Sequence, residues 1–524
     1  LSCSHLTQLS RRTALGELTR PFRHDPLLET LIERGQQHEE AYVQKQKDSG
    51  RTVIDVSVGS GRDVRTLEAM KAGADVIVQA ELRSGHWLGY ADLLLRTSKP
   101  SELGEWSYEV VDTKLAQETK GTTILQLCLY SELLSELQGV MPTQMVVVKP
   151  GEPFHIDAYR LDDFLAYYQV VKENLEEAAA VQRATYPEPV AHCEICNWWT
   201  TCNERRRADD HLSFIAGIRS DQTMELKAQN RDTLKAFADA AEPLDCPPIR
   251  GSVDSFQRIH RQAQIQHAAR TEETLKHELL PIEDGRGFLR LPEPNPGDVF
   301  FDIEGARHAP DGGLEYLLGY VLNENVTPTF HEHWALNRTQ EKAAFEAFID
   351  FLIDRWHLNP GMHIYHYAPY EQSAMKRLAM RHATREDEVD RLLRADRFID
   401  LYAVVRQGLI ASVESYSIKC LEPFYGYDRD AELAEARHGL QRLERTLELG
   451  AADVLAEDQD IVRIYNRDDC ISTLQLRDWL ETLRQQMVDA GHDLPRPDLK
   501  DGAASETAEE RSEAVGRVFD RLVA

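Results

Sequence analysis

Long apolar runs are absent from this sequence. No segment approaches the roughly 20 apolar residues that a membrane-spanning helix needs, and the first residues, LSCSHLTQLSRRTALGEL, contain no secretory apolar core. We therefore expect a cytoplasmic protein with no membrane partner. A phosphate loop of the form GxxxxGKS or GxxxxGKT is also absent, which excludes an obvious ATP-driven motor from the sequence.

Basic residues are in the minority. The 524 residues include 60 Lys and Arg against 88 Asp and Glu, and the formal net charge is −28. This balance excludes a protein that coats DNA through a general basic face, but it is compatible with sites in which carboxylates hold metal ions. The run ERRR at 204–207 is one candidate basic track, although such runs are more often solvated surface.

Cysteines are few, and three of the eight lie close together in HCEICNWWTTCNE. Disulfides are not expected in a cytoplasmic protein, so clustered cysteines indicate metal ligands. Cys193, Cys196 and Cys202 form a C-x2-C-x5-C pattern that needs a fourth ligand. Cys3 is the natural candidate, and His192 is the alternative. Four thiolates suit either zinc or an iron–sulfur cluster.

Apolar periodicity divides the chain into segments of different character. Residues 1–205 alternate strand-like runs such as VIVQAEL with helical patterns. Residues 298–484 follow the order strand, strand, strand, helix, strand, helix, which indicates an RNase H-like α/β fold. Residues 206–245 read as short helices, either a helix-hairpin-helix-like segment or a plain connector. Residues 246–297 read as a linker with one helix, and 485–524 as a weakly anchored tail or a connection to a further domain.

Two acidic residues in apolar strand-like runs form a first candidate site. GYADLLLR contains Asp92, and YEVVDTKL contains Asp112 with Lys114 on the same face of the strand. Charges in such a run are costly to bury unless they are paired or bind metal. The two aspartates and the carbonyl of Thr113 would suit Mg²⁺ or Mn²⁺, and Lys114 would orient water or neutralise developing charge. A polar edge strand is the alternative, because Asp-x-Lys alone is common.

This order of residues resembles the RecB branch of the PD-(D/E)XK nucleases over residues 1–205. The resemblance implies His38, Asp92 and Asp112 as metal ligands, Lys114 as a catalytic residue, and Gln126 and Tyr130, four apart on a helix, as residues that shape the site and grip DNA. The cysteine pattern resembles that of iron–sulfur nucleases in the same group. It implies a 4Fe–4S cluster that staples the start of the domain to its end, with zinc as the alternative.

A third group of residues lies in the second domain. VFFDIEG carries Asp302 and Glu304 two apart on a strand, hence on one face. RIYNRDDCISTL carries Tyr465 and Asp469 four apart on one helical face. Acidic groups brought together repel one another unless cations screen them, and two divalent ions about 4 Å apart could clamp the attacking and leaving oxygens of a phosphodiester. Tyr465 would position the attacking water.

The second domain resembles the DnaQ-like DEDD exonucleases, in particular the YprB type. The resemblance implies a catalytic set of Asp302, Glu304, Glu371, Tyr465 and Asp469, with Asp302, Glu304, Asp400 and Asp469 as metal ligands. The family's second motif usually ends in Asp, whereas YAPYE ends in Glu371, so Asp400 could instead complete the set. Asp468 is the rival of Asp469, but the spacing from Tyr465 favours Asp469.

The two domains, joined by a helical segment, together resemble the nuclease portion of bacterial nuclease–helicase fusions. The resemblance implies a metal-dependent exodeoxyribonuclease that hydrolyses phosphodiester bonds of single-stranded DNA in repair, recombination or phage defence. A helicase, fused or separate, would be its partner. Two alternatives stay open: one nuclease domain is catalytically inactive and serves as a platform for DNA or a helicase, or the whole chain is a structural adaptor with a zinc site.

Overall fold

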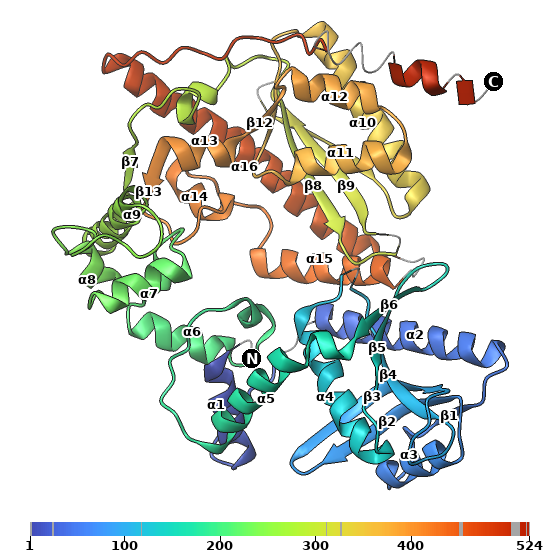
Figure 1. Cartoon of the computed structure of the whole chain (residues 1–524). Coiled ribbons are helices and arrows are strands. Elements are labelled where there is room, and N and C mark those ends of the chain that lie inside the picture. The colour runs from blue at the N-terminus through green and yellow to red at the C-terminus, as the bar shows by residue number, and fades with distance from the viewer. Residues whose placement is uncertain are drawn as a thin grey trace. The chain divides into compact units, whose positions relative to one another are not determined.

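The computed structural model describes residues 3–23, 26–116, 118–310, 312–324, 327–449, 454–504, 514–519 and 521–522 (Figure 1). The chain forms two units, unit 1 (Leu1–Asn203) and unit 2 (Glu204–Ala524). Within the described residues, no helix has both the length and the apolar character needed to cross a bilayer.

Unit 1 is built on one six-stranded sheet in which neighbouring strands follow the chain order β1-β2-β3-β4-β5-β6. The pairs β1–β2 and β4–β5 are parallel, and the other pairs are antiparallel. Its elements are α1 (Ser4–Ala14), α2 (Pro26–Asp48), β1 (Val53–Asp55), α3 (Arg62–Lys71), β2 (Val76–Ser84), β3 (Trp87–Thr97), β4 (Ser107–Thr113), α4 (Gly121–Gln138), β5 (Gln144–Lys149), β6 (His155–Arg160), η1 (Leu161–Asp163), α5 (Leu165–Ala180) and η2 (Ala191–Ile195).

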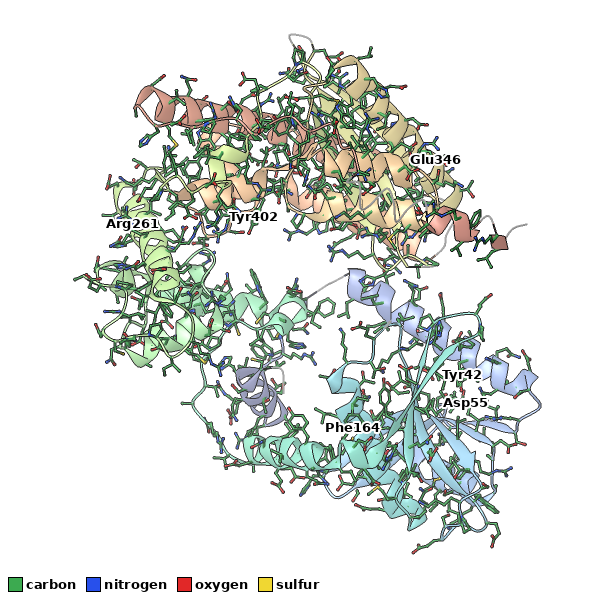
Figure 2. The ribbon with its side chains drawn as sticks, turned by 45° about the horizontal axis from the view of Figure 1, so that its top comes forward. Tyr42, Asp55, Phe164, Arg261, Glu346 and Tyr402 are labelled. Atoms are coloured by element: carbon green, nitrogen blue, oxygen red, sulfur yellow. The ribbon has the colours of Figure 1, made fainter. Side chains whose placement is uncertain are left out.

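Both faces of this sheet are covered. Alternate residues of β2, β3 and β4 pack on one side against α3, α4 and α5, and on the other against α2. Tyr42 on α2 and Phe164 at the start of α5 belong to these two opposite faces (Figure 2). Because side chains alternate along a strand, the two polar positions Asp92 and Asp112 must each be accommodated within a largely apolar layer.

Unit 2 begins with a small helical core. α6 (Trp199–Ala208) crosses the boundary between the units, and η3 (Leu212–Phe214), α7 (Ser220–Ala228), α8 (Leu234–Ala238) and α9 (Val253–Glu272) follow. Buried residues of these helices, among them Leu226, Phe237 and Phe256, form one apolar cluster. Gln262 on α9 donates a hydrogen bond to the carbonyl of Ala411, so this core is tied to the rest of unit 2.

The rest of unit 2 is centred on a five-stranded sheet of order β10-β9-β8-β11-β12. The first three strands are antiparallel, and β11 and β12 run parallel to β8. The elements are β7 (His277–Leu279), η4 (Gly287–Arg290), β8 (Val299–Ala306), β9 (Leu314–Leu322), β10 (Thr329–Trp334), α10 (Arg338–Leu358), β11 (Ile364–His366), α11 (Tyr370–His382), α12 (Glu386–Arg394), β12 (Phe398–Asp400), α13 (Leu401–Gly408), β13 (Leu409–Ala411), α14 (Ile418–Tyr425), α15 (Leu433–Glu448) and α16 (Ala456–Asp489).

Helices cover both faces of the second sheet. α10, α11 and α12 pack on the face that contains Phe301, while α13, α14 and α16 pack on the face that contains Phe300. Every residue of β9 is buried, as expected for the uninterrupted apolar run LEYLLGYVL between two helical layers. The long helix α16 lies along β8 and β9 and so brings its polar residues to the strand that carries Asp302 (Figure 1).

Two connecting segments are better anchored than their composition suggests. Within residues 246–297, β7 pairs with β13 in a small antiparallel sheet. After α16, Arg496 forms ion pairs with Glu481 and Glu293, and Leu494 is buried. These contacts are to side chains that no local sequence pattern reveals.

Candidate functional site

Three carboxylates from β8 and α16 meet in unit 2. Oxygen atoms of Asp302, Glu304 and Asp469 all lie within 4.8 Å of one another, and no other group of three acidic, histidine or cysteine ligands does so among the described residues. Asp302 and Glu304 share one face of β8 because they are two residues apart. Asp469 projects from α16, which packs along that strand. We call these three residues the acidic triad.

The triad has the electrostatics of a cation site. Burial raises the pKa of Asp302 well above its ordinary value, and the charges of Glu304 and Asp469 raise it further. Burial, and then the charge of Asp469, raises the pKa of Glu304 to about 8. Clustered carboxylates are disfavoured in their charged form unless a cation lies among them. Oxygen ligands of this kind fit Mg²⁺ or Mn²⁺.

An asparagine and a glycine complete the support of Asp302, and the sequence analysis missed both. The side-chain amide of Asn466 donates a hydrogen bond of 2.7 Å to Oδ2 of Asp302. Gly319 lies opposite Asp302 on β9, and a Cβ atom there would lie only 1.7 Å from Oδ1 of Asn466. Only glycine leaves room for this amide. Asn466 precedes Asp469 by three residues and shares its helical face, which is the one local signal for it.

Tyr465 lies beside the triad together with two cations. Burial, followed by the charge of Asp469, raises its pKa to about 12, so the hydroxyl stays protonated at neutral pH. The ammonium of Lys419 lies 4.7 Å from the centre of the Tyr465 ring and 3.4 Å from Oδ2 of Asp469. Nη2 of Arg429 lies 2.6 Å from the other oxygen, Oδ1. Neither cation was singled out from the sequence.

Glu371 is near the triad but not part of it. It begins α11 and is buried, and its Oε2 lies 3.2 Å from Nδ1 of the buried His366. Its charge contributes to the raised pKa of Asp302, so the two carboxylates are electrostatically coupled. The structure therefore brings Glu371 to the edge of the site with an Oε2 that has no hydrogen-bond partner among the described residues, because Nδ1 of His366 lies closer to the carbonyl oxygen of Ala368, at 2.7 Å.

Asp400, predicted as a metal ligand, makes hydrogen bonds to the backbone of two segments. Its Oδ1 accepts hydrogen bonds from the backbone N–H groups of Ala368 and Tyr402, at 3.0 and 2.9 Å. Asp400 is thus the N-cap of α13, a position that favours Asp because a carboxylate satisfies free N–H groups there. The carboxylate lies outside the triad, and its interactions join the loop before Glu371 to α13.

Asp468, the rival of Asp469, faces away from the triad. Its side chain is fully buried and accepts hydrogen bonds from the hydroxyl of Tyr427 and the backbone N–H of Ala431, at 3.1 and 2.9 Å. These contacts occupy both of its carboxylate oxygens. The neighbouring Asp469 is the residue whose side chain reaches Asp302.

The residues predicted in unit 1 also converge. The ammonium of Lys114 lies 2.6 Å from Oδ2 of the buried Asp112. Oδ2 of Asp92 accepts hydrogen bonds from the backbone N–H and the hydroxyl of Thr113, at 2.8 and 3.0 Å. Burial, and then the charge of Asp92, raises the pKa of Asp112 to about 7. Oδ1 of Asp112 is buried without a hydrogen-bond partner among the described residues, and such an orphan oxygen fits a site built for a cation.

Helix α2 contributes a residue that the sequence analysis did not select. Nε2 of the predicted ligand His38 lies 3.1 Å from the carbonyl oxygen of Val148. The next residue, Glu39, instead faces the acidic pair: the charges of Asp92 and Lys114 both act on its pKa, which burial raises. Its Oε1 accepts a hydrogen bond of 2.7 Å from Gln79. The sequence HEE offered both residues, and the orientation of α2 distinguishes them.

Gln126 and Tyr130 contact each other as their spacing predicts. The amide of Gln126 donates a hydrogen bond of 2.9 Å to the hydroxyl of Tyr130. The Tyr130 ring packs on β3 at Gly89, where a Cβ atom would lie 2.3 Å from the ring. Because Gly89 precedes Asp92 by three residues, this pair lies against the strand that carries the acidic site.

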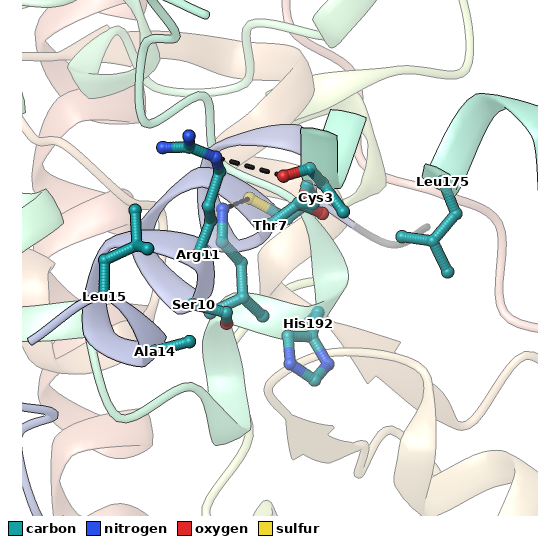
Figure 3. Close-up of a pocket in the computed structure, with 10 residues that line it drawn as sticks. Cys3, Thr7, Ser10, Arg11, Ala14, Leu15, Leu175 and His192 are labelled. Carbon is teal, nitrogen blue, oxygen red and sulfur yellow. Dashed lines mark hydrogen bonds between the residues drawn. The ribbon is translucent and has the colours of Figure 1, made fainter. Parts of the chain in front are cut away.

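The start of unit 1 lies next to its cysteine-containing end. Nδ1 of His5 lies 2.8 Å from the hydroxyl of Thr185, and Gln8 donates a hydrogen bond to the carbonyl of Ala178. Cys3 and His192 both line a cavity of about 730 Å³ (Figure 3). The chain thus places Cys3 near the segment that contains the other three cysteines.

Among the described residues, no three of the cysteine sulfurs lie within 4.8 Å of one another. Thiolates around one tetrahedral zinc would be about 3.8 Å apart, given Zn–S bonds of about 2.3 Å. In the structure, the sulfurs of Cys3, Cys193, Cys196 and Cys202 are therefore not gathered as the four ligands of one bound zinc ion would be.

A comparison with known families supports part of this assignment. Residues 299–481, about a third of the chain, match the family model of the RNase_H superfamily. This region is thus an RNase H-like domain, of a type whose members are usually metal-dependent nucleases that act on nucleic acid. No curated protein matches the chain.

Proposed function

We propose that the RNase H-like domain is a DEDD-type exonuclease that hydrolyses phosphodiester bonds of DNA, with a preference for single strands. The observation that carries the proposal is the acidic triad at the junction of β8 and α16. Mg²⁺ or Mn²⁺ held by the triad would polarise the phosphate and lower the pKa of an attacking water. Tyr465, protonated and adjacent, would orient that water.

The alternative, in which this domain binds DNA or a helicase without catalysis, is less well supported. Loss of catalysis would remove the need to keep three mutually repelling carboxylates together. The Asn466 amide and the small Gly319 hold Asp302 in that arrangement. Roles in repair, recombination or phage defence, and a helicase partner, belong to this proposal only through the resemblance to nuclease–helicase fusions.

The test is cleavage of end-labelled oligonucleotides by the purified chain. We expect single-stranded DNA to be degraded in Mg²⁺ or Mn²⁺, more slowly when it is paired in a duplex, and not at all in EDTA. RNA of the same sequence and labels at both ends establish the sugar preference and the polarity. Cleavage that continues unchanged in excess EDTA would contradict a metal-dependent site.

A second nuclease site is proposed in unit 1, of the PD-(D/E)XK type. The supporting observation is the convergence of Asp92, Asp112 and Lys114, with the unpaired buried oxygen of Asp112. Two carboxylates would hold the divalent ion, and Lys114 would stabilise charge that develops on the phosphate. Glu39 would join this site in the place for which His38 was predicted.

We also propose that the four cysteines hold a 4Fe–4S cluster, with zinc as the alternative, because their pattern resembles that of iron–sulfur nucleases and Cys3 lines one cavity with His192, the neighbour of Cys193. Protein purified without oxygen is expected to be brown and to contain about four iron atoms per chain. Cys196→Ser should lose the iron, whereas Cys246→Ser, a change at an exposed cysteine outside the group, should retain it. Stoichiometric zinc without iron, measured by elemental analysis, would contradict the cluster.

A further inference from the structure

Two cations converge on one carboxylate of the acidic triad. Lys419 comes from α14, and Arg429 follows that helix. Their side chains lie 3.4 and 2.6 Å from the two different oxygens of Asp469. Both cations also lie over the ring of Tyr465, at 4.7 and 5.7 Å from its centre. Lys419, Arg429 and Tyr465 thus form one wall of the site.

The charge of Arg429 is already balanced without Asp469. Its Nε lies 2.9 and 3.0 Å from the two carboxylate oxygens of Glu422, and Ser472 donates a hydrogen bond to the same carboxylate. This bidentate pairing fixes the plane of the guanidinium. Glu422 therefore serves as the permanent partner of Arg429, and the contact with Asp469 is additional.

One donor of Arg429 has nothing to bind. The side chain is only 6% exposed, yet its Nη1 is buried without a hydrogen-bond partner among the described residues. A buried N–H group without an acceptor destabilises the folded protein, and more so when it is charged. Such a group at a reaction site indicates an acceptor that arrives with the substrate.

Lys419 would become available for a new partner when the triad binds a divalent ion. Its side chain is 30% exposed, and Asp469 is its ion-pair partner. A triad carboxylate that binds a divalent ion shares its charge with that ion, so its hold on the ammonium weakens. The ammonium would then have unmet positive charge beside the triad, as the buried Nη1 of Arg429, which has no hydrogen-bond partner among the described residues, already has. The anion that a phosphodiester hydrolase brings to this place is a phosphate.

We propose that Lys419 and Arg429 form a clamp for the phosphate group of the nucleic-acid substrate beside the acidic triad. Lys419 contacts the reacting phosphate directly, and Arg429, oriented by Glu422, donates from Nη1 to a second oxygen of the same group. The inference rests on the proposed function of the RNase H-like domain and adds two residues to it. If Lys419 and Arg429 only neutralised Asp469, replacing them would change the stability of the protein. It would not change the difference in affinity between DNA with charged and with neutral linkages.

The test measures whether Lys419 makes the affinity for DNA depend on the negative charge of the phosphodiester linkages at its ends. Fluorescence anisotropy gives the affinity for two single-stranded DNA oligonucleotides, one natural and one with neutral methylphosphonate linkages at both ends. Ca²⁺ replaces Mg²⁺, and a gel confirms that the DNA stays intact. Wild-type protein should bind the neutral form about tenfold more weakly, as the loss of a charged hydrogen bond predicts. Lys419→Gln should bind the two forms equally, and Lys419→Arg should restore most of the difference.

Arg463→Gln is the matched control. Arg463 also lies on the α16 side of the domain and pairs with a carboxylate, Glu332, but not with the triad. The Arg463→Gln variant loses one positive charge, as Lys419→Gln does, but it should still bind the natural oligonucleotide more tightly than the neutral-ended one. In Mg²⁺ and in a Lys114→Ala background, which disables the proposed site of unit 1, Lys419→Gln should lower kcat about 10²-fold, the usual effect of removing one donor to a transition-state oxygen, with a much smaller change in KM.

Arg429 is tested together with its partner, because Arg429→Gln alone would leave Glu422 buried and unpaired. The double variant Glu422→Gln with Arg429→Gln should fold and also lose the preference for charged ends. The clamp is overturned if Lys419→Gln and the double variant both keep the wild-type preference. In that case, cleavage by the Lys114→Ala variant that an added Asp302→Asn abolishes would leave the nuclease proposal intact. If wild-type protein does not cleave at all, both proposals fail.

Discussion

Asp302→Asn is expected to lower the Mg²⁺-dependent cleavage rate of the RNase H-like domain by about 10³-fold or more. Asn has the shape of Asp, and its amide oxygen can still accept the hydrogen bond from Asn466. The change removes one of the three charged oxygen ligands. The rate is best measured on single-stranded DNA in a Lys114→Ala background, in which the proposed site of unit 1 is disabled. Residual cleavage then reports on the triad alone.

Asp460→Asn provides the control for this prediction. Asp460 lies on α16, as Asp469 does, but its side chain is 65% exposed and pairs only with Arg463 among the described contacts. Its variant should cleave like the wild type. Metal binding gives an independent readout, since Mn²⁺ should raise the melting temperature of wild-type protein by more than that of Asp302→Asn, which keeps only the proposed site of unit 1. A variant that keeps both its activity and its Mn²⁺ response would refute the assignment of Asp302.

Asp302→Asn should be no less stable than the wild type when metal is removed. A carboxyl group whose pKa is raised in the folded protein weakens stability progressively as the pH rises from the ordinary carboxyl pKa to the raised value. For Glu304 that window extends to about pH 8, and the pKa of Asp302 is also raised. In EDTA at the upper end of this window, Asp302→Asn should therefore melt at the same temperature as the wild type or higher. This outcome separates loss of a ligand from loss of the fold.

Local spacing explains which parts of the site could be predicted from the sequence. Asp302 and Glu304 share a face because a strand alternates every two residues, and Tyr465 and Asp469 share one because a helix nearly repeats every four. These rules hold whatever the rest of the fold does. The order of strands and helices in the second domain likewise follows from apolar periodicity, and the structure shows the same order along the chain.

Contacts between distant segments explain what could not be predicted. Asn466 meets Asp302 across 164 positions of the chain, and Arg429 reaches Asp469 across 40. No local pattern marks such partners. Asp400 shows a second limit, because an Asp after a strand suits a helix N-cap and a metal ligand equally well, and only its three backbone partners in the structure identify the cap.

Orientation is the third limit, and it applies to unit 1. His38 and Glu39 are adjacent on α2, so their side chains point about 100° apart around the helix axis. The sequence cannot say which of these directions faces the sheet. In the structure His38 meets the carbonyl of Val148, whereas Glu39 lies within the influence of Asp92 and Lys114. A histidine next to a glutamate is therefore a weak guide to the ligand.

Lys114→Ala is expected to lower cleavage by the proposed site of unit 1 about 10²–10³-fold. The change removes the cation that lies 2.6 Å from Asp112, and with it the group placed to stabilise charge on a reacting phosphate. The rate is measured in an Asp302→Asn background, so that only unit 1 contributes. Lys71→Ala, a change at an exposed lysine on α3, is the control for loss of one positive charge and should not alter the rate.

Cleavage rates of the Asp302→Asn and Lys114→Ala variants together show how many active sites the chain has. Loss of cleavage in either single variant on a given substrate shows that one site handles that substrate, whereas partial loss in both shows that the two sites share it. The variant with Asp302→Asn and Lys114→Ala should have no metal-dependent cleavage left. Wild-type activity in that double variant would mean that neither group of converging carboxylates performs hydrolysis, because the triad would lack one of its metal ligands and the site of unit 1 would lack its cation.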